Sequence, residues 1–512
     1  MTKSLQRFLN YLRSDKFYRL VLVVFIIEAA WIAISAAYPQ AFDENYHFGL
    51  IKVYSHYWLP FFTHQPPNAD AFGAVARDPS YLYHYLMSFP YRLIELFTKR
   101  QMVQIVILRF INVGLFVWGI TLFRRVLLKA GTSKALTNLS LMLFILIPIV
   151  PQLAAQINYD NLMIPLTALM ILITFKLTDQ IRAHAVSIFD FSYFIGIGLL
   201  TSLVKYAFLP IYAAMALFLV VVVFRANRKH SVRKFFNQLK ESWKSISRPL
   251  IKAALIILMV VPLAMFVQRD IGNLIEYHSI EPNCSKVLSV KQCMAYSPWA
   301  ANYKRHTKLV SSGNAVSLST IFVYPFQWLY WMWFRLFFAV NGPNGNFTNY
   351  PPLPLPSAAT LILLIGGVIA VLKWWRKLFR NNLKLLLLLF ISGAYIVALI
   401  GQGYYTYTYT KVLENMNGRY LVPILLLLAA IFGQALSHML AKANTRKALF
   451  AAIILLFFLE GGGVITFIAR SNASWDVENK TVVKVNDAAR KLVKKVIITG
   501  RKKYDSNLWF FN

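Results

Sequence analysis

Long apolar segments recur along this chain and constrain its fold more than any single motif. A helix needs about 20 mostly apolar residues to cross the hydrocarbon core of a membrane. Hydrophobic residues make up 58% of the 512-residue chain and charged residues only 14%, which excludes an ordinary soluble enzyme. The sequence predicts an all-α polytopic integral membrane protein with about eleven transmembrane helices, within a range of about 10 to 13. We expect them near 18–38, 102–123, 137–153, 160–177, 189–204, 207–224, 252–268, 356–373, 384–401, 420–438 and 447–468.

Basic residues indicate which ends of these spans face the cytoplasm. The chain has 54 lysines and arginines against 20 acidic residues, a formal net charge of +34. The basic loops, such as KWWRKLFRNNLK after the eighth span, all fall on one side if the N-terminus is cytoplasmic and the spans alternate. Because these residues lie between spans and form no separate domain, nucleic-acid binding is not expected. We expect a multi-pass protein of the plasma (inner) membrane with a cytoplasmic N-terminus.

This membrane topology places two large loops on the outer side, over about 39–101 and 269–355. Each contains an apolar segment, 81–97 and 320–340, that we expect to lie as a helix at the membrane surface. Pro90 and several polar residues interrupt the first, and tyrosine and tryptophan crowd the second. The alternative is two extra spans, which would invert the loops between them.

The transmembrane domain then covers residues 1–470, and residues 471–512 form a short basic tail that this topology places outside. The chain has two cysteines, Cys284 and Cys293, both in the second outer loop. They could form a disulfide in an oxidising compartment, or remain as thiols. Two cysteines are too few for a zinc or iron–sulfur site.

The most unusual polar stretch is AFDENYHFGL, directly after the first span. On a helix, Asp43 and Glu44 lie four and three residues before His47, so both carboxylates can approach the imidazole. Two adjacent carboxylates repel one another at a water–membrane boundary, an environment in which a carboxylate becomes a useful general base. The alternative is an acidic cap on a helix that begins near Phe42.

Further polar residues lie at the outer ends of distant spans. Asn158, Asp160 and Asn161 open the fourth span, where polar groups need partners and tend to line a cavity. Asp160 could instead only cap that helix. Lys205 lies at a tight outer turn and Arg419 opens the tenth span, on the side that should be poor in positive charge. Both could hold a lipid phosphate, with snorkelling to the interface as the alternative.

Two further charged residues, Glu28 and Arg109, fall inside the first and second spans. Because charges are costly in hydrocarbon, we expect both to face the bundle interior, where they could pair with each other in a structural role. The chain contains no Walker A loop, no His-Glu-x-x-His and no Gly-x-Ser-x-Gly motif. Its nine histidines are scattered without metal-ligand spacing, so no metal site is predicted from them.

Five of these elements together resemble the GT-C superfamily of polytopic glycosyltransferases, and more closely a bacterial family of GT-C-like integral membrane proteins. They are FDENYHF, DPSYLYHYL at 78–86, NYDN at 158–161, VKYAFLP around Lys205 and NGRYLVP at 417–423. The closest relatives often read Pro-Pro-x-Tyr-Tyr where this chain has DPSYLY, a departure that concerns the acceptor more than the class.

The resemblance implies an enzyme that moves a sugar from a polyprenyl-phosphate-linked donor to a glycan, lipid or protein acceptor on the outer face, with inversion. Asp43 would be the catalytic base and Glu44 its auxiliary. No cofactor would be required, although Asp43, Glu44 and Asp160 could serve a divalent cation, Mg²⁺ or Mn²⁺. A transporter or flippase of lipid-linked glycans is the alternative, and a surface-polysaccharide polymerase or ligase would differ only in substrate. Substrate binding would fall to His47, Tyr81, Asn158, Asp160, Asn161, Lys205, Arg419 and Tyr420.

Overall fold

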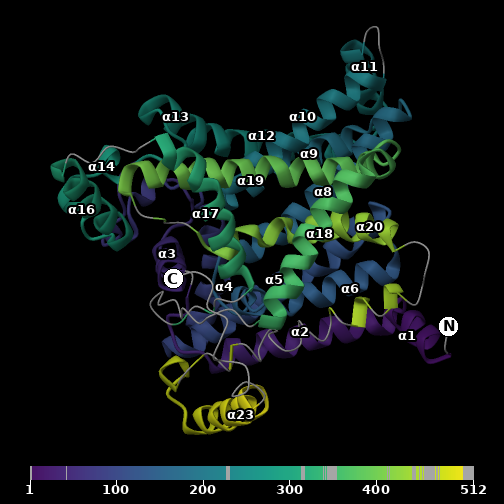
Figure 1. Cartoon of the computed structure of the whole chain (residues 1–512). Coiled ribbons are helices and arrows are strands. Elements are labelled where there is room, and N and C mark those ends of the chain that lie inside the picture. Colours follow the sequence, from purple (N-terminus) through teal and green to yellow (C-terminus); the bar gives the residue numbers. More distant parts are fainter. Residues whose placement is uncertain are drawn as a thin grey trace.

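The chain is a bundle of helices with no strand among the residues that the structure describes (Figure 1). The structure is a computed structural model. It describes residues 3–41, 43–226, 231–312, 318–337, 340, 342, 354–411, 413, 416–440, 446–448, 450–452, 454, 467–468, 471 and 473–499. Within these residues, the β-type backbone pairing is limited to one isolated bridge between Ala36 and Asp476.

Among the described residues, eight helices are long and apolar enough to cross a membrane, which confirms the prediction of an all-α polytopic membrane protein. Two shorter apolar helices, Lys134–Ile145 and Ile188–Val204, also coincide with predicted spans. The last predicted span, 447–468, lies mostly outside the described residues. The helices of the bundle are α2 (Asp15–Ser35), α5 (Gln101–Lys129), α6 (Lys134–Ile145), α8 (Asp160–Arg182), α9 (Ile188–Val204), α10 (Leu209–Ala226), α12 (Pro249–Phe266), α18 (Pro354–Phe379), α19 (Leu383–Thr410) and α20 (Val422–Met439).

The third predicted span is broken where the sequence contains proline. Helix α6 ends at Ile145, and a short second helix, α7 (Ile149–Ala154), begins only after Pro148. Proline has no backbone N–H to donate and disfavours helical geometry in the residue before it, so a continuous helix through this point is costly. The short helix α7 packs against α8, and the connection between them contains several polar residues of the candidate site.

The two segments predicted to lie at the membrane surface form helices, and neither is among the candidate spans. They are α4 (Leu82–Phe97), which contains Pro90, and α17 (Leu318–Phe337). In Figure 1, α3 (Glu44–Ser55), α14 (Cys284–Val287) and α16 (Ser297–Ser312) gather at the left end of the bundle, and α1 (Lys3–Leu12) and α11 (Ser231–Lys244) lie at the right end. The segments predicted to lie on opposite sides of the membrane therefore occupy opposite ends of the bundle.

The C-terminal tail docks at the same end of α2 that leads into α3. Ala37 N donates to Trp475 O and Val477 N donates to Ser35 O, each at 2.8 Å. The tail's own helix, α23 (Lys480–Thr499), is shown in yellow beside α2 in Figure 1. The membrane topology predicted from the sequence likewise places the tail on the same side as the first large loop.

Cys284 and Cys293 form a disulfide with a Cα–Cα distance of 5.8 Å. The bond joins α14 to α15 (Val290–Cys293), in the second large loop. Disulfides persist in oxidising compartments, so this bond agrees with a loop that faces outward.

Candidate functional site

The acidic residue that opens the candidate site, Asp43, is held in an unusual backbone conformation. It precedes α3 with φ 65° and ψ 31°, in the left-handed region that aspartate tolerates better than most residues. Asp43 occupies the N-cap position of α3 and Glu44 lies in the first turn, but the Asp43 side chain makes no capping hydrogen bond to the helix. The carboxylate is instead 59% exposed and accepts a hydrogen bond from Arg419 Nη2 at 2.9 Å.

Arg419 reaches Asp43 from the other end of the sequence and is itself buried, with 4% of its surface exposed. It lies in a short 3₁₀ turn, η6 (Gly418–Leu421), where Asn417 Oδ1 accepts a hydrogen bond from Arg419 N at 3.1 Å. The turn packs tightly on α17, and a Cβ at Gly418 would lie 2.4 Å from the Leu336 Cα. Glycine is therefore required beside Arg419.

A second ion pair, between Asp160 and Lys205, lies beside the first and is fully buried. Lys205 Nζ lies 2.5 Å from Asp160 Oδ1, and both side chains are less than 5% exposed. The ammonium group also lies 4.4 Å from the Tyr159 ring centroid and 5.1 Å from that of Tyr420. The Arg419 guanidinium carbon is 5.1 Å from the same Tyr420 ring, so one aromatic side chain contacts both cations.

Two buried histidines, His47 and His84, lie beside these two ion pairs. His47 Nδ1 and His84 Nε2 are 2.8 Å apart, and the His47 ring packs edge-on against Tyr159 with centroids 4.5 Å apart. Burial lowers the pKa of His84 to about 3. Burial, the neighbouring His84 and the cations Arg419 and Lys205 also lower the pKa of His47 well below its usual range. Both imidazoles are therefore neutral at pH 7, so one ring nitrogen can donate a hydrogen bond to the other.

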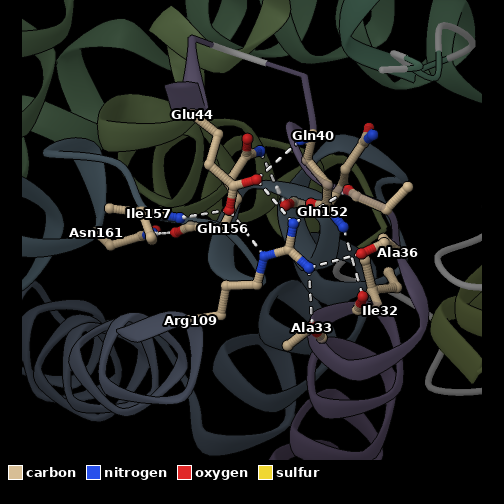
Figure 2. Close-up of polar contacts among 11 residues, drawn as sticks. Ile32, Ala33, Ala36, Gln40, Glu44, Arg109, Gln152, Gln156, Ile157 and Asn161 are labelled. Atoms are coloured by element: carbon tan, nitrogen blue, oxygen red, sulfur yellow. Dashed lines mark hydrogen bonds and ion pairs between the residues drawn. The ribbon is translucent and has the colours of Figure 1, made fainter. Parts of the chain in front are cut away.

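Glu44, the expected auxiliary to Asp43, points the other way into the bundle (Figure 2). Its two oxygens bind the Arg109 guanidinium, with Nε at 2.8 Å and Nη2 at 2.7 Å, and both side chains are completely buried. Glu44 also accepts hydrogen bonds from Gln40 N at 2.8 Å and Ile157 N at 3.2 Å. Glu44 is thus occupied by structural contacts, and its expected role as an auxiliary base is not supported by this geometry.

Arg109, which the sequence suggested could face Glu28, forms its ion pair with Glu44. Its remaining donors bind the carbonyl oxygens of Ala33, Ala36 and Ala37 at 2.7 to 3.2 Å, at the end of α2 (Figure 2). The prediction that both charged residues face the interior is confirmed, since Arg109 is fully buried and Glu28 is 8% exposed. The Arg109 contacts fix the turn that leads from the first span to Asp43.

The asparagines predicted to bind substrate hold the loop before α8. Asn158 Oδ1 accepts a hydrogen bond from Asp160 N at 2.9 Å. Asn161 Nδ2 lies within 3.1 Å of Asn112 Oδ1, of the Leu153 carbonyl in α7 and of the Gln156 carbonyl in the loop. Asn112 Oδ1 also accepts a hydrogen bond from Tyr83 OH at 2.8 Å. These contacts position Asp160, so we assign the two asparagines a positioning role.

Tyr81 is buried in a different group of side chains. Its ring lies 4.3 Å from the Arg269 guanidinium carbon, and Arg269 Nη1 donates to Asp78 O at 2.8 Å. Ser80 Oγ accepts a hydrogen bond from Tyr206 N at 3.1 Å. The DPSY element therefore joins the first outer loop to the turn that carries Lys205, and Tyr81 contacts Arg269 where substrate contact was expected.

Three carboxylates were considered as ligands for a divalent cation, and the structure gives each a different cationic partner. Asp43 binds Arg419, Glu44 binds Arg109 and Asp160 binds Lys205. In the part of the chain that the structure describes, no group of three or more His, Cys, Asp or Glu side chains could hold a metal ion. We therefore do not include a divalent cation in the function proposed below.

The structure also brings in residues that the sequence did not single out. His84 and Tyr159 contact His47, and Tyr46 OH donates to Asp78 Oδ2 at 3.3 Å. His84 lies within DPSYLYHYL and Tyr159 within NYDN, two of the motifs already quoted. For His84, a polar residue inside an otherwise apolar helix was the available signal.

No protein-family description matches this chain by sequence, and no curated protein matches it. Among solved structures it is similar to the archaeal oligosaccharyltransferase AglB from Archaeoglobus fulgidus, which was solved in complex with an inhibitory peptide and a dolichol-phosphate. The two are 13% identical, with a TM-score of 0.41, over 93% of this chain and 60% of AglB. The chain thus spans less than two thirds of that protein. At this level the similarity carries no argument about function.

Proposed function

We propose that this chain is a GT-C-type membrane glycosyltransferase that moves a sugar from a polyprenyl-phosphate-linked donor to a cell-envelope acceptor on the outer face of the membrane. One observation carries the proposal. An exposed carboxylate, Asp43, lies 2.9 Å from a buried cation, Arg419. A second buried cation, Lys205, contacts the same Tyr420 ring as Arg419 does. A base open to an acceptor thus lies beside two cations suited to a phosphate.

The unequal burial of the two acids determines what an incoming anion can displace. Asp160 is 2% exposed, and leaving the Lys205 interaction would strand a charge in the interior. Asp43 is mostly exposed and can return to water at little cost. A lipid phosphate would therefore replace Asp43 on Arg419, whose planar guanidinium suits two phosphate oxygens. Donor binding would in this way free the Asp43 carboxylate.

The proposed reaction is an inverting displacement at the anomeric carbon of the donor sugar. The acceptor hydroxyl oxygen forms a bond to that carbon, and Asp43 takes the hydroxyl proton. The bond from the anomeric carbon to the phosphate oxygen breaks, and its electron pair stays on the lipid phosphate. Arg419 and Lys205 stabilise the negative charge that develops there. His47, Asp160 and Tyr420 would contact the sugar or the phosphate from the floor of the site.

Reconstitution tests the proposal. The full chain in liposomes, supplied with a mixture of polyprenyl-phosphate sugars and a cell-envelope extract as acceptor, should transfer labelled sugar. Asp43→Asn should lower the rate about 100-fold or more, as expected for loss of a general base. Asp70→Asn, another acid of the same outer loop, is the matched control and should leave the rate unchanged.

Two outcomes would reject the proposal. Movement of lipid-linked sugar across the bilayer without transfer would assign the chain to transport. Full transfer activity in Asp43→Asn would exclude Asp43 as the base.

A further inference from the structure

A groove at the opposite end of the bundle from Asp43 combines an apolar wall with two arginines. It has a volume of about 310 Å³ and lies between the ends of α8 and α10 and the beginning of α19. Arg182 is the last residue of α8, and Arg225 is the residue before the end of α10. Asp160 begins α8, and Lys205 lies just before the turn that leads into α10, so the groove and the candidate site lie at opposite ends of these helices.

The walls of the groove suit a hydrocarbon chain. They include Phe218, Val222, Leu386 and Phe390, and the lining is almost entirely apolar apart from the two arginines. Phe390 is 39% exposed. The three helices that line the groove, α8, α10 and α19, are all long and apolar enough to cross a membrane. Apolar side chains in this position face lipid, so an acyl chain is the ligand that would fill the groove without desolvating a polar group.

The charges at the end of the groove are not compensated by nearby acids. Asp179, one turn before Arg182, is bound by Lys384 Nζ at 2.7 Å, and Asp190 is bound by Lys176 at 2.9 Å. Neither Arg182 nor Arg225 has an ion pair within the described residues, and both are exposed. Two uncompensated guanidinium groups above an apolar groove are complementary to a lipid whose headgroup carries a phosphate and a net negative charge.

We propose that this groove is a binding site for an anionic phospholipid of the leaflet opposite the candidate active site. The phosphate would bind Arg182 and Arg225, and one acyl chain would lie along Phe218, Val222, Leu386 and Phe390. Because Asp160 begins α8 and Lys205 lies just before the turn that leads into α10, a lipid that stabilises the packing of both helices with α19 would also support these two residues. The inference rests on the groove alone and is independent of the proposed enzyme activity.

Native mass spectrometry of the full chain tests this proposal. Purified protein would be incubated with phosphatidylglycerol or phosphatidylcholine of identical acyl chains, and the retained lipid measured. The wild type should retain the anionic lipid preferentially. The double variant Arg182→Gln/Arg225→Gln should bind it about tenfold more weakly or worse, as expected for the loss of charge-assisted hydrogen bonds to phosphate.

Two further variants keep the test specific. Arg233→Gln/Arg248→Gln removes two exposed arginines from the same end of the bundle, outside the groove, and should bind as the wild type does. Val221→Trp places a bulky ring at the partly exposed wall without removing charge, and should also weaken binding. Size-exclusion profiles would confirm that each variant is folded.

Three results would overturn the proposal. The first is equal retention of the two lipids by the wild type, and the second is unchanged binding of phosphatidylglycerol by the Arg182→Gln/Arg225→Gln variant. The third is retention of added polyprenyl phosphate with no retention of phosphatidylglycerol, which would show a ligand other than a bilayer phospholipid.

Discussion

Replacing Glu44 by glutamine should destabilise the protein severely. The Glu44 side chain accepts four hydrogen bonds, two from Arg109 and two from backbone N–H groups, and no part of it is exposed. Arg109 in turn uses its remaining donors on backbone carbonyls of residues 33, 36 and 37. Removing one partner of such a buried pair leaves an uncompensated charge and costs about 3–5 kcal/mol of unfolding free energy.

The prediction can be measured by unfolding purified protein with increasing fractions of SDS in mixed micelles, followed by circular dichroism. Glu44→Gln and Arg109→Met should each lose about 3–5 kcal/mol. The double variant should lose less than the sum by about 1–3 kcal/mol, because the two groups interact directly. Glu95→Gln is the matched control, since Glu95 pairs with Lys99 at 3.6 Å on the surface and solvent screens that pair.

A different pattern would refute this reasoning. If Glu44→Gln unfolded like the wild type and yet abolished sugar transfer, Glu44 would act in the chemistry rather than in the fold. Additive losses in the double variant would show that the Glu44 and Arg109 side chains do not stabilise one another.

Two further predictions concern pH and topology. Burial keeps the pKa of His84 near 3, far below the value of about 6.5 in an unfolded chain. The free energy of unfolding should therefore fall as the pH drops below about 6.5, by up to about 1.4 kcal/mol per pH unit for this histidine. In SDS unfolding, His84→Gln should show a weaker dependence of this free energy on pH. His56→Gln, which changes an exposed histidine, should keep the dependence of the wild type. In a cysteine-free background, Lys291→Cys should react with a membrane-impermeant maleimide on intact cells, and Lys240→Cys only after permeabilisation. The reverse labelling would invert the proposed topology.

The spans could be predicted from the sequence because hydrocarbon tolerates few polar groups, so length and composition nearly decide them. The break at Pro148 was missed because the apolar run continues on both sides of the proline, and hydropathy does not register a lost backbone hydrogen bond. The surface helices around Pro90 and over 318–337 were predicted correctly as helices, since their polar and aromatic residues distinguish them from spans.

The candidate site could be predicted only in part. The order of the motifs identified Asp43, Asp160, Lys205 and Arg419, which the structure brings together as two neighbouring ion pairs. Which acid pairs with which base depends on contacts between residues far apart in the chain, and no local pattern encodes them. For the same reason the sequence did not identify Glu44 as the partner of Arg109.

A structure of the full chain with a bound polyprenyl phosphate tests the central claim most directly. The account predicts phosphate oxygens within hydrogen-bond distance of Arg419 and Lys205, with the Asp43 carboxylate released from Arg419 and facing the sugar end of the ligand. The account would be contradicted by a phosphate bound elsewhere, for example at Arg182 and Arg225, while the 2.9 Å contact between Asp43 and Arg419 stays intact.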